Sequence, residues 1–171
     1  MKSCNYKAGP GWKEQLRHSL SGKVAVLGVG NELKGDDGVG PQVVRQLRES
    51  TQAKPFDVGV APENWVSPVA RWKPDTVLVV DAVELGAQPG AIQLVDTRDV
   101  SSGGASSHAL SLCVWFRLLQ QRTKARMILL GVQPGQTQFA TGMGHAVQAA
   151  VEEIVEFLGE LLGDKAMSSK M

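Results

Sequence analysis

The sequence predicts an α/β fold, a three-layer α/β/α sandwich whose five-stranded twisted sheet is mostly parallel and carries an antiparallel hairpin at one edge. Short apolar segments of strand length alternate with longer segments in which apolar residues recur at helical spacing. One segment, 76–83 (TVLVVDAV), is apolar nearly throughout, which is typical of a strand buried on both faces. The length of 171 residues suits one domain.

The first half of the chain supplies the predicted centre of the sheet. Strands are expected at 23–29, 56–60 and 76–83, and helices at 12–20, 39–49 and 62–72. In the helix at 39–49, one face carries Val39, Val43, Val44 and Leu47. Pro68 is expected to break or kink the helix at 62–72, because proline lacks the N–H that a helix interior needs.

The second half adds the predicted edge and two long helices. Pro89 and Gly90 form a short turn before a strand at 91–95, so this strand is expected to pair with 76–83 as an antiparallel hairpin. A Ser/Gly stretch at 101–107 leads into a helix at 109–121; a strand at 126–132 and a helix at 144–162 follow. We expect an N-terminal extension with a short helix (1–22), a single α/β domain (23–163) and a disordered tail (164–171).

The amino-acid composition limits the classes of protein to which this chain can belong. Apolar residues make up 43% and charged residues 20%, which fits a globular protein. The net charge of +1 gives no reason to expect nucleic-acid binding, and no apolar run reaches membrane-spanning length. The N-terminal residues lack the hydrophobic core of a signal peptide, and Cys4 and Cys113 form no disulfide pattern. We therefore expect a cytoplasmic protein, and its balanced surface and modest size fit a monomer.

The run 30–40 (GNELKGDDGVG) is the most informative motif. It follows the first predicted strand and precedes a helix, which places two carboxylates at the edge where open α/β sheets bind ligands. Leu33 stands where a dinucleotide-binding motif has its third glycine, and the acids would repel pyrophosphate, so no organic cofactor is expected. Carboxylates in this turn suit a metal, a cationic group or acid/base work on water.

Further groups should meet these acids at the same edge. Asp81 ends a buried strand, and His108 stands where the Ser/Gly stretch meets a helix. Two carboxylates and an imidazole can hold a borderline divalent ion or deprotonate a water. Plainer roles stay open: Asp36 or Asp37 as a helix cap, and His108 as a surface or capping residue. Asp81 is harder to explain in this way, because an unpaired carboxylate is costly to bury.

The motif at 28–40 (GVGNELKGDDGVG) resembles the signature of the hydrogenase maturation proteases, which trim the C-terminal extension of [NiFe]-hydrogenase large subunits once nickel is inserted. The resemblance continues in order through 61–64 (APEN), 78–82 (LVVDA), 107–108 and 130–134 (LGVQP). The APEN and GVQP segments are most similar to the branch that processes hydrogenase 3 of formate hydrogenlyase and related enzymes.

The resemblance implies roles for named residues. Asp37, Asp81 and His108 match a metal-binding triad, and Asp57 matches a further acid of the family. The family often has Asp-Gly-Gly where this chain has Asp57-Val58-Gly59. The implied partner is a [NiFe]-hydrogenase large-subunit precursor, which supplies the nickel. Either a carboxylate or the ion then activates the attack on the scissile bond.

Three other classes of function remain as alternatives. A nickel-sensing maturation chaperone would use the same residues without cutting. A self-sufficient metallopeptidase would carry its own metal and cut general peptides. A nucleotide-dependent enzyme of Rossmann type would bind NAD or ATP tightly.

Overall fold

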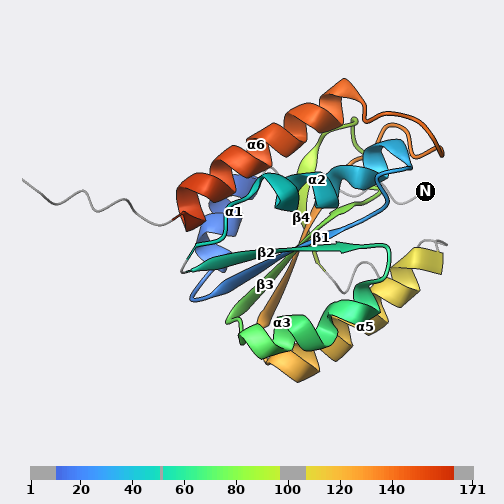
Figure 1. The fold of residues 1–171 in the computed structure, drawn as a ribbon. Helices are drawn as coiled ribbons and strands as arrows, with labels where there is room; N and C mark the ends of the chain where they lie inside the picture. Colours follow the sequence, from blue (N-terminus) through green and yellow to red (C-terminus); the bar gives the residue numbers. More distant parts are fainter. Residues whose placement is uncertain (1–10, 51, 97–106, 164–171) are drawn as a thin grey trace, which may run out of the picture.

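The structure is a computed structural model that describes residues 11–50, 52–96 and 107–163, with side chains omitted for 107–111. Its centre is a five-stranded sheet in the order β2-β1-β3-β5-β4 (Figure 1). The strands are β1 (Val24–Val29), β2 (Ala53–Gly59), β3 (Thr76–Ala82), β4 (Ile92–Val95) and β5 (Arg126–Val132). β2, β1, β3 and β5 run parallel, and β4 is antiparallel to β5. The predicted fold class is confirmed.

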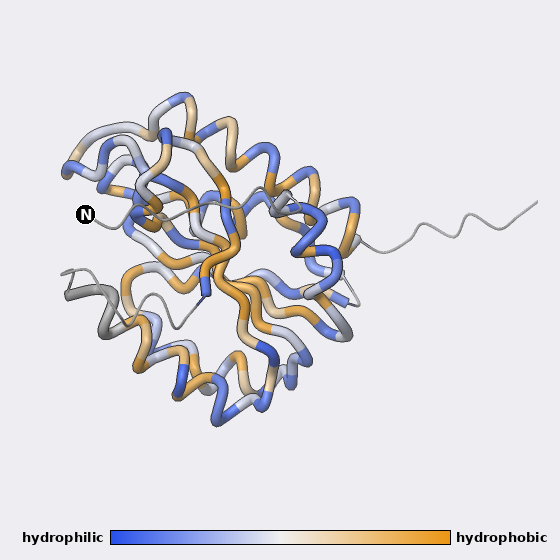
Figure 2. The backbone as a smooth tube through the Cα atoms, turned by 180° about the vertical axis from the view of Figure 1, so that it is seen from behind, coloured by the Kyte–Doolittle hydropathy of each residue, from blue (hydrophilic) through white to orange (hydrophobic). Residues whose placement is uncertain are grey.

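Helices cover both faces of the sheet and make the three layers (Figure 1). One face carries α1 (Trp12–Ser19), α2 (Val39–Gln46) and α6 (His145–Leu162), and the other carries α3 (Val66–Trp72) and α5 (Ser107–Thr123). Alternate residues of the central strands point to opposite faces: Val26 and Leu78 to the first core, Leu27 and Val77 to the second. The hydrophobic residues therefore follow the strands through the middle of the molecule (Figure 2).

The predicted hairpin partner of the edge strand is wrong. β3 is flanked by β1 and β5 along its length, so it has no free edge to offer. β4 pairs with β5 instead, with Ile92 opposite Val132 and Val95 opposite Leu129. The segment between β3 and β4 crosses the end of β5, where Gln133 donates its backbone N–H to Ala91 (2.9 Å) and accepts that of Gly90 (2.8 Å).

Prolines shift two predicted boundaries. β2 begins at Ala53 rather than at residue 56, because it is an edge strand that tolerates Pro55. The segment at 62–72 starts as a 3-10 turn, η2 (Pro62–Trp65), and becomes α-helical at Val66. The break thus precedes Pro68, which lies in the first turn of α3, where a missing N–H costs no helical bond.

Two helices end elsewhere than predicted. α2 stops at Gln46, because Leu47 has extended backbone angles, although its side chain still packs against the core. α5 spans Ser107–Thr123, two residues longer at each end than predicted.

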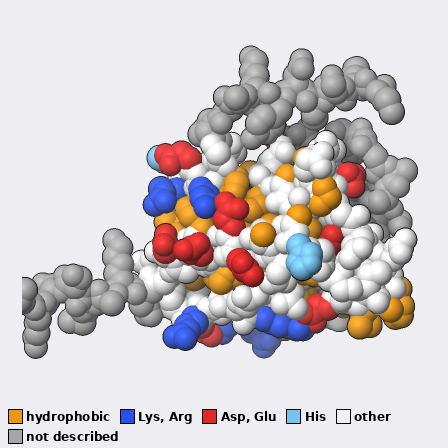
Figure 3. Space-filling view, turned by 90° about the horizontal axis from the view of Figure 1, so that it is seen from above, with side chains coloured by type: hydrophobic (Ala, Val, Ile, Leu, Met, Phe, Trp, Pro, Cys, Tyr) orange, Lys and Arg blue, Asp and Glu red, His pale blue; other side chains and the backbone are white. Residues whose placement is uncertain are grey.

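The predicted N-terminal helix is found at Trp12–Ser19 and packs into the core. Leu16 is fully buried, and the Trp12 ring meets the Phe157 ring of α6 edge-on at 5.2 Å. Lys13 pairs with Glu153 at 3.0 Å. Figure 3 shows acidic and basic side chains close together on the face seen from above. Within the described part of the chain, no helix is both long and apolar enough to cross a membrane. Residues 1–10 and the predicted disordered tail lie outside the described residues.

Candidate functional site

Two glycines bring the acidic turn onto the sheet. Gly30, directly after β1, has φ 141°, and a Cβ there would lie 1.9 Å from the Asp37 carbonyl oxygen. A Cβ on Gly40 would lie 2.4 Å from the carbonyl oxygens of both Val29 and Val80. Glycine at these positions lets α2 start directly above β1 and β3. The short 3-10 helix η1 (Gly35–Gly38), which carries the two aspartates, consequently contacts β3.

Asp37 and Asp81 come together at this edge, as the sequence predicts. Asp37 is partly buried and accepts the Asn31 backbone N–H at 2.8 Å. Asp81 is the last residue but one of β3 and is also partly buried. Burial and, next, the nearby negative charge of Asp37 raise the pKa of Asp81 well above its ordinary value. Among the ion pairs of the described residues, none involves either carboxylate.

This pair of carboxylates has two chemical uses. A cation placed between them would relieve the repulsion that disfavours the charged form of Asp81. Alternatively, the raised pKa lets Asp81 hold a proton at a higher pH than an ordinary aspartate does, so that it can act as an acid. Oxygen donors of this kind suit a divalent ion that keeps open positions for a substrate.

His108 lies in the first turn of α5, after the Ser/Gly stretch, as predicted. Its side chain is outside the described part of the structure, so its place in the triad remains a prediction. Among the side chains that are described, no group of three His, Cys, Asp or Glu residues is placed to hold a metal.

Asp36 has a structural role, as expected for one of the two adjacent acids. Its side chain is 1% exposed and accepts three backbone N–H groups of the loop between β5 and α6. Oδ2 accepts from Gly135 (2.7 Å) and Gln136 (2.9 Å), and Oδ1 accepts from Gly144 (2.7 Å). Asp36 therefore ties the turn that carries Asp37 to the loop before α6, rather than capping α2.

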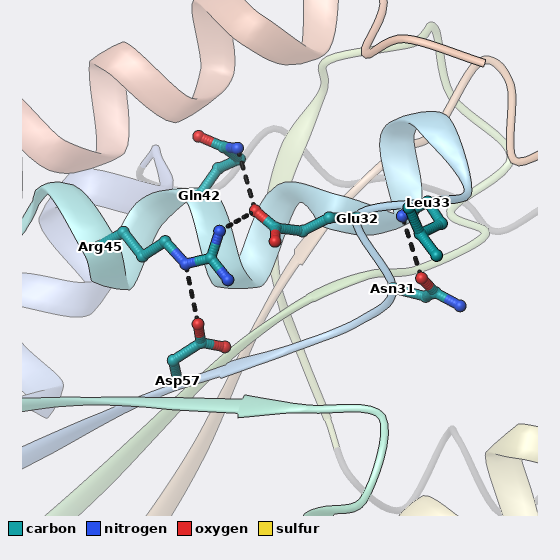
Figure 4. Close-up of polar contacts among 6 residues, drawn as sticks. All are labelled: Asn31, Glu32, Leu33, Gln42, Arg45 and Asp57. Carbon is teal, nitrogen blue, oxygen red and sulfur yellow. Dashed lines mark hydrogen bonds and ion pairs between the residues drawn. The ribbon is translucent and has the colours of Figure 1, made fainter. Parts of the chain in front are cut away.

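Asp57 points to a different set of partners. It accepts a hydrogen bond from Nε of Arg45 at 2.8 Å, and the same guanidinium pairs with Glu32 (Figure 4). The hydrogen bonds to Glu32 and Asp57 raise the pKa of Arg45. Gln42 also donates to Glu32, at 3.1 Å. Among the described residues, the Asp57 side chain is thus hydrogen-bonded to Arg45 of α2, and no hydrogen bond joins it to Asp37 or Asp81.

The sequence alone did not single out Gln133 as an organising residue. It is 4% exposed and follows β5 directly. Its Oε1 accepts the N–H groups of Leu85 (2.7 Å) and Ala87 (3.3 Å), and its Nε2 donates to Glu84 (2.9 Å). Gln133 therefore holds the segment that leaves β3 just after Asp81. A polar residue at the end of a buried strand is the signal that points to such a role.

Comparisons with known proteins identify relatives of this chain. A sequence model of a family described as hydrogenase maturation protease matches residues 41–160. The hydrogenase 3 maturation protease of Escherichia coli K12 is 30% identical over 136 residues, which covers 78% of this chain and 86% of that protein.

Solved structures are similar as well. The [NiFe] hydrogenase maturation protease HycI of Thermococcus kodakarensis superposes with a TM-score of 0.78 at 28% identity, covering 86% of this chain and 98% of that one. The endopeptidase HycI of Escherichia coli gives a TM-score of 0.69 at 28% identity, covering 78% and 87%.

Proposed function

This chain belongs to the hydrogenase maturation protease family, and we propose that it is the endopeptidase that removes the C-terminal extension of a [NiFe]-hydrogenase large-subunit precursor after nickel insertion. The observation that carries the proposal is the Asp37–Asp81 pair at the carboxyl edge of the sheet, because Asp81 carries a raised pKa beside a second carboxylate. We propose that the protein acts as a cytoplasmic monomer.

Recognition of nickel would rest on Asp37, Asp81 and His108. The precursor brings the ion, so nickel is part of the substrate and not a resident cofactor. The repulsion between Asp37 and Asp81 supports this assignment, since a cation would offset this repulsion, which adds to burial in raising the Asp81 pKa. When present, the ion would polarise the scissile carbonyl.

The protein's own groups can manage the protons of the hydrolysis. The Asp37 carboxylate can accept a proton from the attacking water and pass it to the leaving amine, while Asp81 helps to hold the ion. The Asn31 N–H, which Asp37 accepts at 2.8 Å, fixes one of its carboxylate oxygens. Asp36 contributes by holding η1 in place and does not touch the reacting atoms.

A cleavage assay read by mass spectrometry tests this function. The protein is incubated with a large-subunit precursor in nickel-loaded and nickel-free forms, and the intact mass of the precursor is followed. Loss of a C-terminal peptide from the loaded form alone would support the proposal. A precursor that binds but keeps its mass in both forms would contradict it and favour a maturation chaperone.

Two controls sharpen the assay. Glu152→Gln removes an exposed carboxylate on α6 and should cleave as the wild type does. An unrelated peptide should survive incubation, because a self-sufficient metallopeptidase would cut it.

A further inference from the structure

Exposed hydrophobic side chains surround the carboxyl edge of the sheet. Leu33 (61% exposed) follows β1, Val60 (70%) follows β2 and Phe139 (68%) follows β5. These strands are parallel, so all three side chains belong to loops at the same edge as Asp37 and Asp81. We refer to Leu33, Val60 and Phe139 as the apolar rim.

Backbone hydrogen bonds join the three loops of the apolar rim. Gly30 donates to the carbonyl of Gly59 at 3.0 Å, and Ala140 donates to that of Leu33 at 2.7 Å. Lys34 and Thr141 add a parallel bridge between the loops after β1 and β5, which lie side by side in Figure 1. The Leu33 N–H is itself held by Asn31 Oδ1 at 2.9 Å (Figure 4).

Hydrogen bonds inside the loop that carries Phe139, and from this loop to Asp36, also hold it in place. Thr141 Oγ1 donates to the Gln138 carbonyl at 2.7 Å, and Gln136 Nε2 donates to the Gly142 carbonyl at 2.8 Å. The buried Asp36 carboxylate accepts N–H groups at both ends of this loop. Ala140 has φ 62°, a conformation that costs a non-glycine residue energy and persists only where the surroundings hold it.

Exposing large apolar side chains to water is unfavourable. In flexible loops such side chains can turn inward, whereas the hydrogen-bonded loops of the apolar rim keep them exposed. Preformed apolar anchors of this kind lose little entropy on binding, which is typical of the residues that dominate protein interfaces. The apolar rim thus has the properties of a docking surface.

We infer that the apolar rim docks the folded body of the large-subunit precursor beside its scissile extension. The inference rests on the proposed function: Leu33 and Asp37 share one turn, so a precursor whose scissile bond reaches Asp37 lies beside Leu33. Lys34, exposed next to Leu33 and in no ion pair among the described residues, favours an apolar partner surface with an acidic margin. Docking in this way sets affinity for the precursor and leaves the chemistry at Asp37 and Asp81 unchanged.

Binding of the nickel-loaded precursor to two sets of variants tests the rim. The first is Leu33→Ser/Val60→Ser/Phe139→Ser. The control is Val114→Ser/Leu118→Ser, which removes two exposed hydrophobic side chains from the outer face of α5. Both are made in an Asp37→Asn background to stop cleavage, and thermal melting checks that they fold. We expect the rim variant to raise the Kd at least tenfold and the control to leave it within twofold.

The same substitutions in the active protein should raise KM at least tenfold and keep kcat within twofold. A rim variant that binds as tightly as its parent would overturn the inference, as would a control that weakens binding equally. Failure of the proposed function has a different signature: the wild type binds the precursor and releases no peptide, while the binding comparison still decides the role of the rim.

Discussion

Asp36 and Gly144 are joined by a hydrogen bond of 2.7 Å, in which the Asp36 carboxylate accepts the N–H of the residue that precedes α6. Asp37, the next residue, accepts the Asn31 N–H instead, and its negative charge is responsible for part of the raised Asp81 pKa. Under the proposed function, the two adjacent aspartates have separate roles: Asp36 assembles the edge of the sheet, and Asp37 takes part in the reaction. Each role predicts a different response to substitution.

Replacing Asp36 should damage the fold. Asp36→Ala leaves three backbone N–H groups without their buried acceptor, so we expect a loss of about 3 kcal/mol in the free energy of unfolding. For a chain of this size that corresponds to a fall of roughly 10 °C in the melting temperature. Asp37→Asn should melt within about 3 °C of the wild type, since its parent carboxylate is only partly buried. Equal melting temperatures for the two variants would contradict this division.

The Asp81→Asn variant should be more stable than the wild type at high pH. The pKa of Asp81 is raised in the folded state, so the folded protein holds this proton more tightly than the unfolded chain does. Its contribution to stability is present below the ordinary aspartate pKa and is lost as the pH climbs through the raised value. Asp81→Asn cannot ionise and escapes this loss.

The measurement is a pair of melting curves taken at several pH values. The Asp81→Asn variant should melt above the wild type at pH 8, and the gap should narrow toward pH 4. A gap that stays constant with pH would mean that the ionisation of Asp81 is not its cause. The variant should be inactive at every pH if Asp81 belongs to the reacting centre.

Replacing Arg45 should affect stability little, in a manner that depends on salt. Its guanidinium is exposed, and exposed ion pairs contribute little because water and salt screen them. Arg45→Gln leaves Glu32 and Asp57 close together without their shared cation, so the melting temperature should fall slightly in low salt and recover in high salt. A fall that persists at high salt would point to packing by the Arg45 stem.

Replacing Gly40 should separate α2 from the sheet. A methyl group at this position meets two strand carbonyls at 2.4 Å, so Gly40→Ala should cost about 3 kcal/mol. Because α2 follows η1 directly, the shift should also displace Asp37 and reduce cleavage. Gly159→Ala on α6, where a Cβ meets nothing within 4 Å, is the matched control and should be stable and active.

The sequence predicts the centre of the sheet better than its edges. Apolar runs mark β1, β3 and β5 to within a residue or two, because strands buried on both faces need apolar residues throughout. The partner of β4 was missed because strand pairing is a long-range choice: β5, which takes the place beside β3, lies far along the chain. Pro55 concealed the start of β2, since its tolerance depends on β2 being an edge strand.

The candidate site shows the same limit. Asp81 stands out because its strand is otherwise apolar and an unpaired carboxylate is costly to bury there. The parallel pairing of β1 and β3 then predicts that Asp37 lies at the same edge. The local sequence does not show which of the two adjacent acids is structural, because the hydrogen-bond partners of Asp36 lie about a hundred residues away in the chain. The pairing of Asp57 with Arg45 likewise depends on how α2 lies over β2.

The central claim is that Asp37 acts in the hydrolysis of the nickel-loaded precursor, and its most direct test is the intact mass of that precursor after incubation with Asp37→Asn. The account predicts that the variant melts normally and leaves the mass unchanged, while the wild type releases the C-terminal peptide. Release of the same peptide by Asp37→Asn at the wild-type rate would contradict the account.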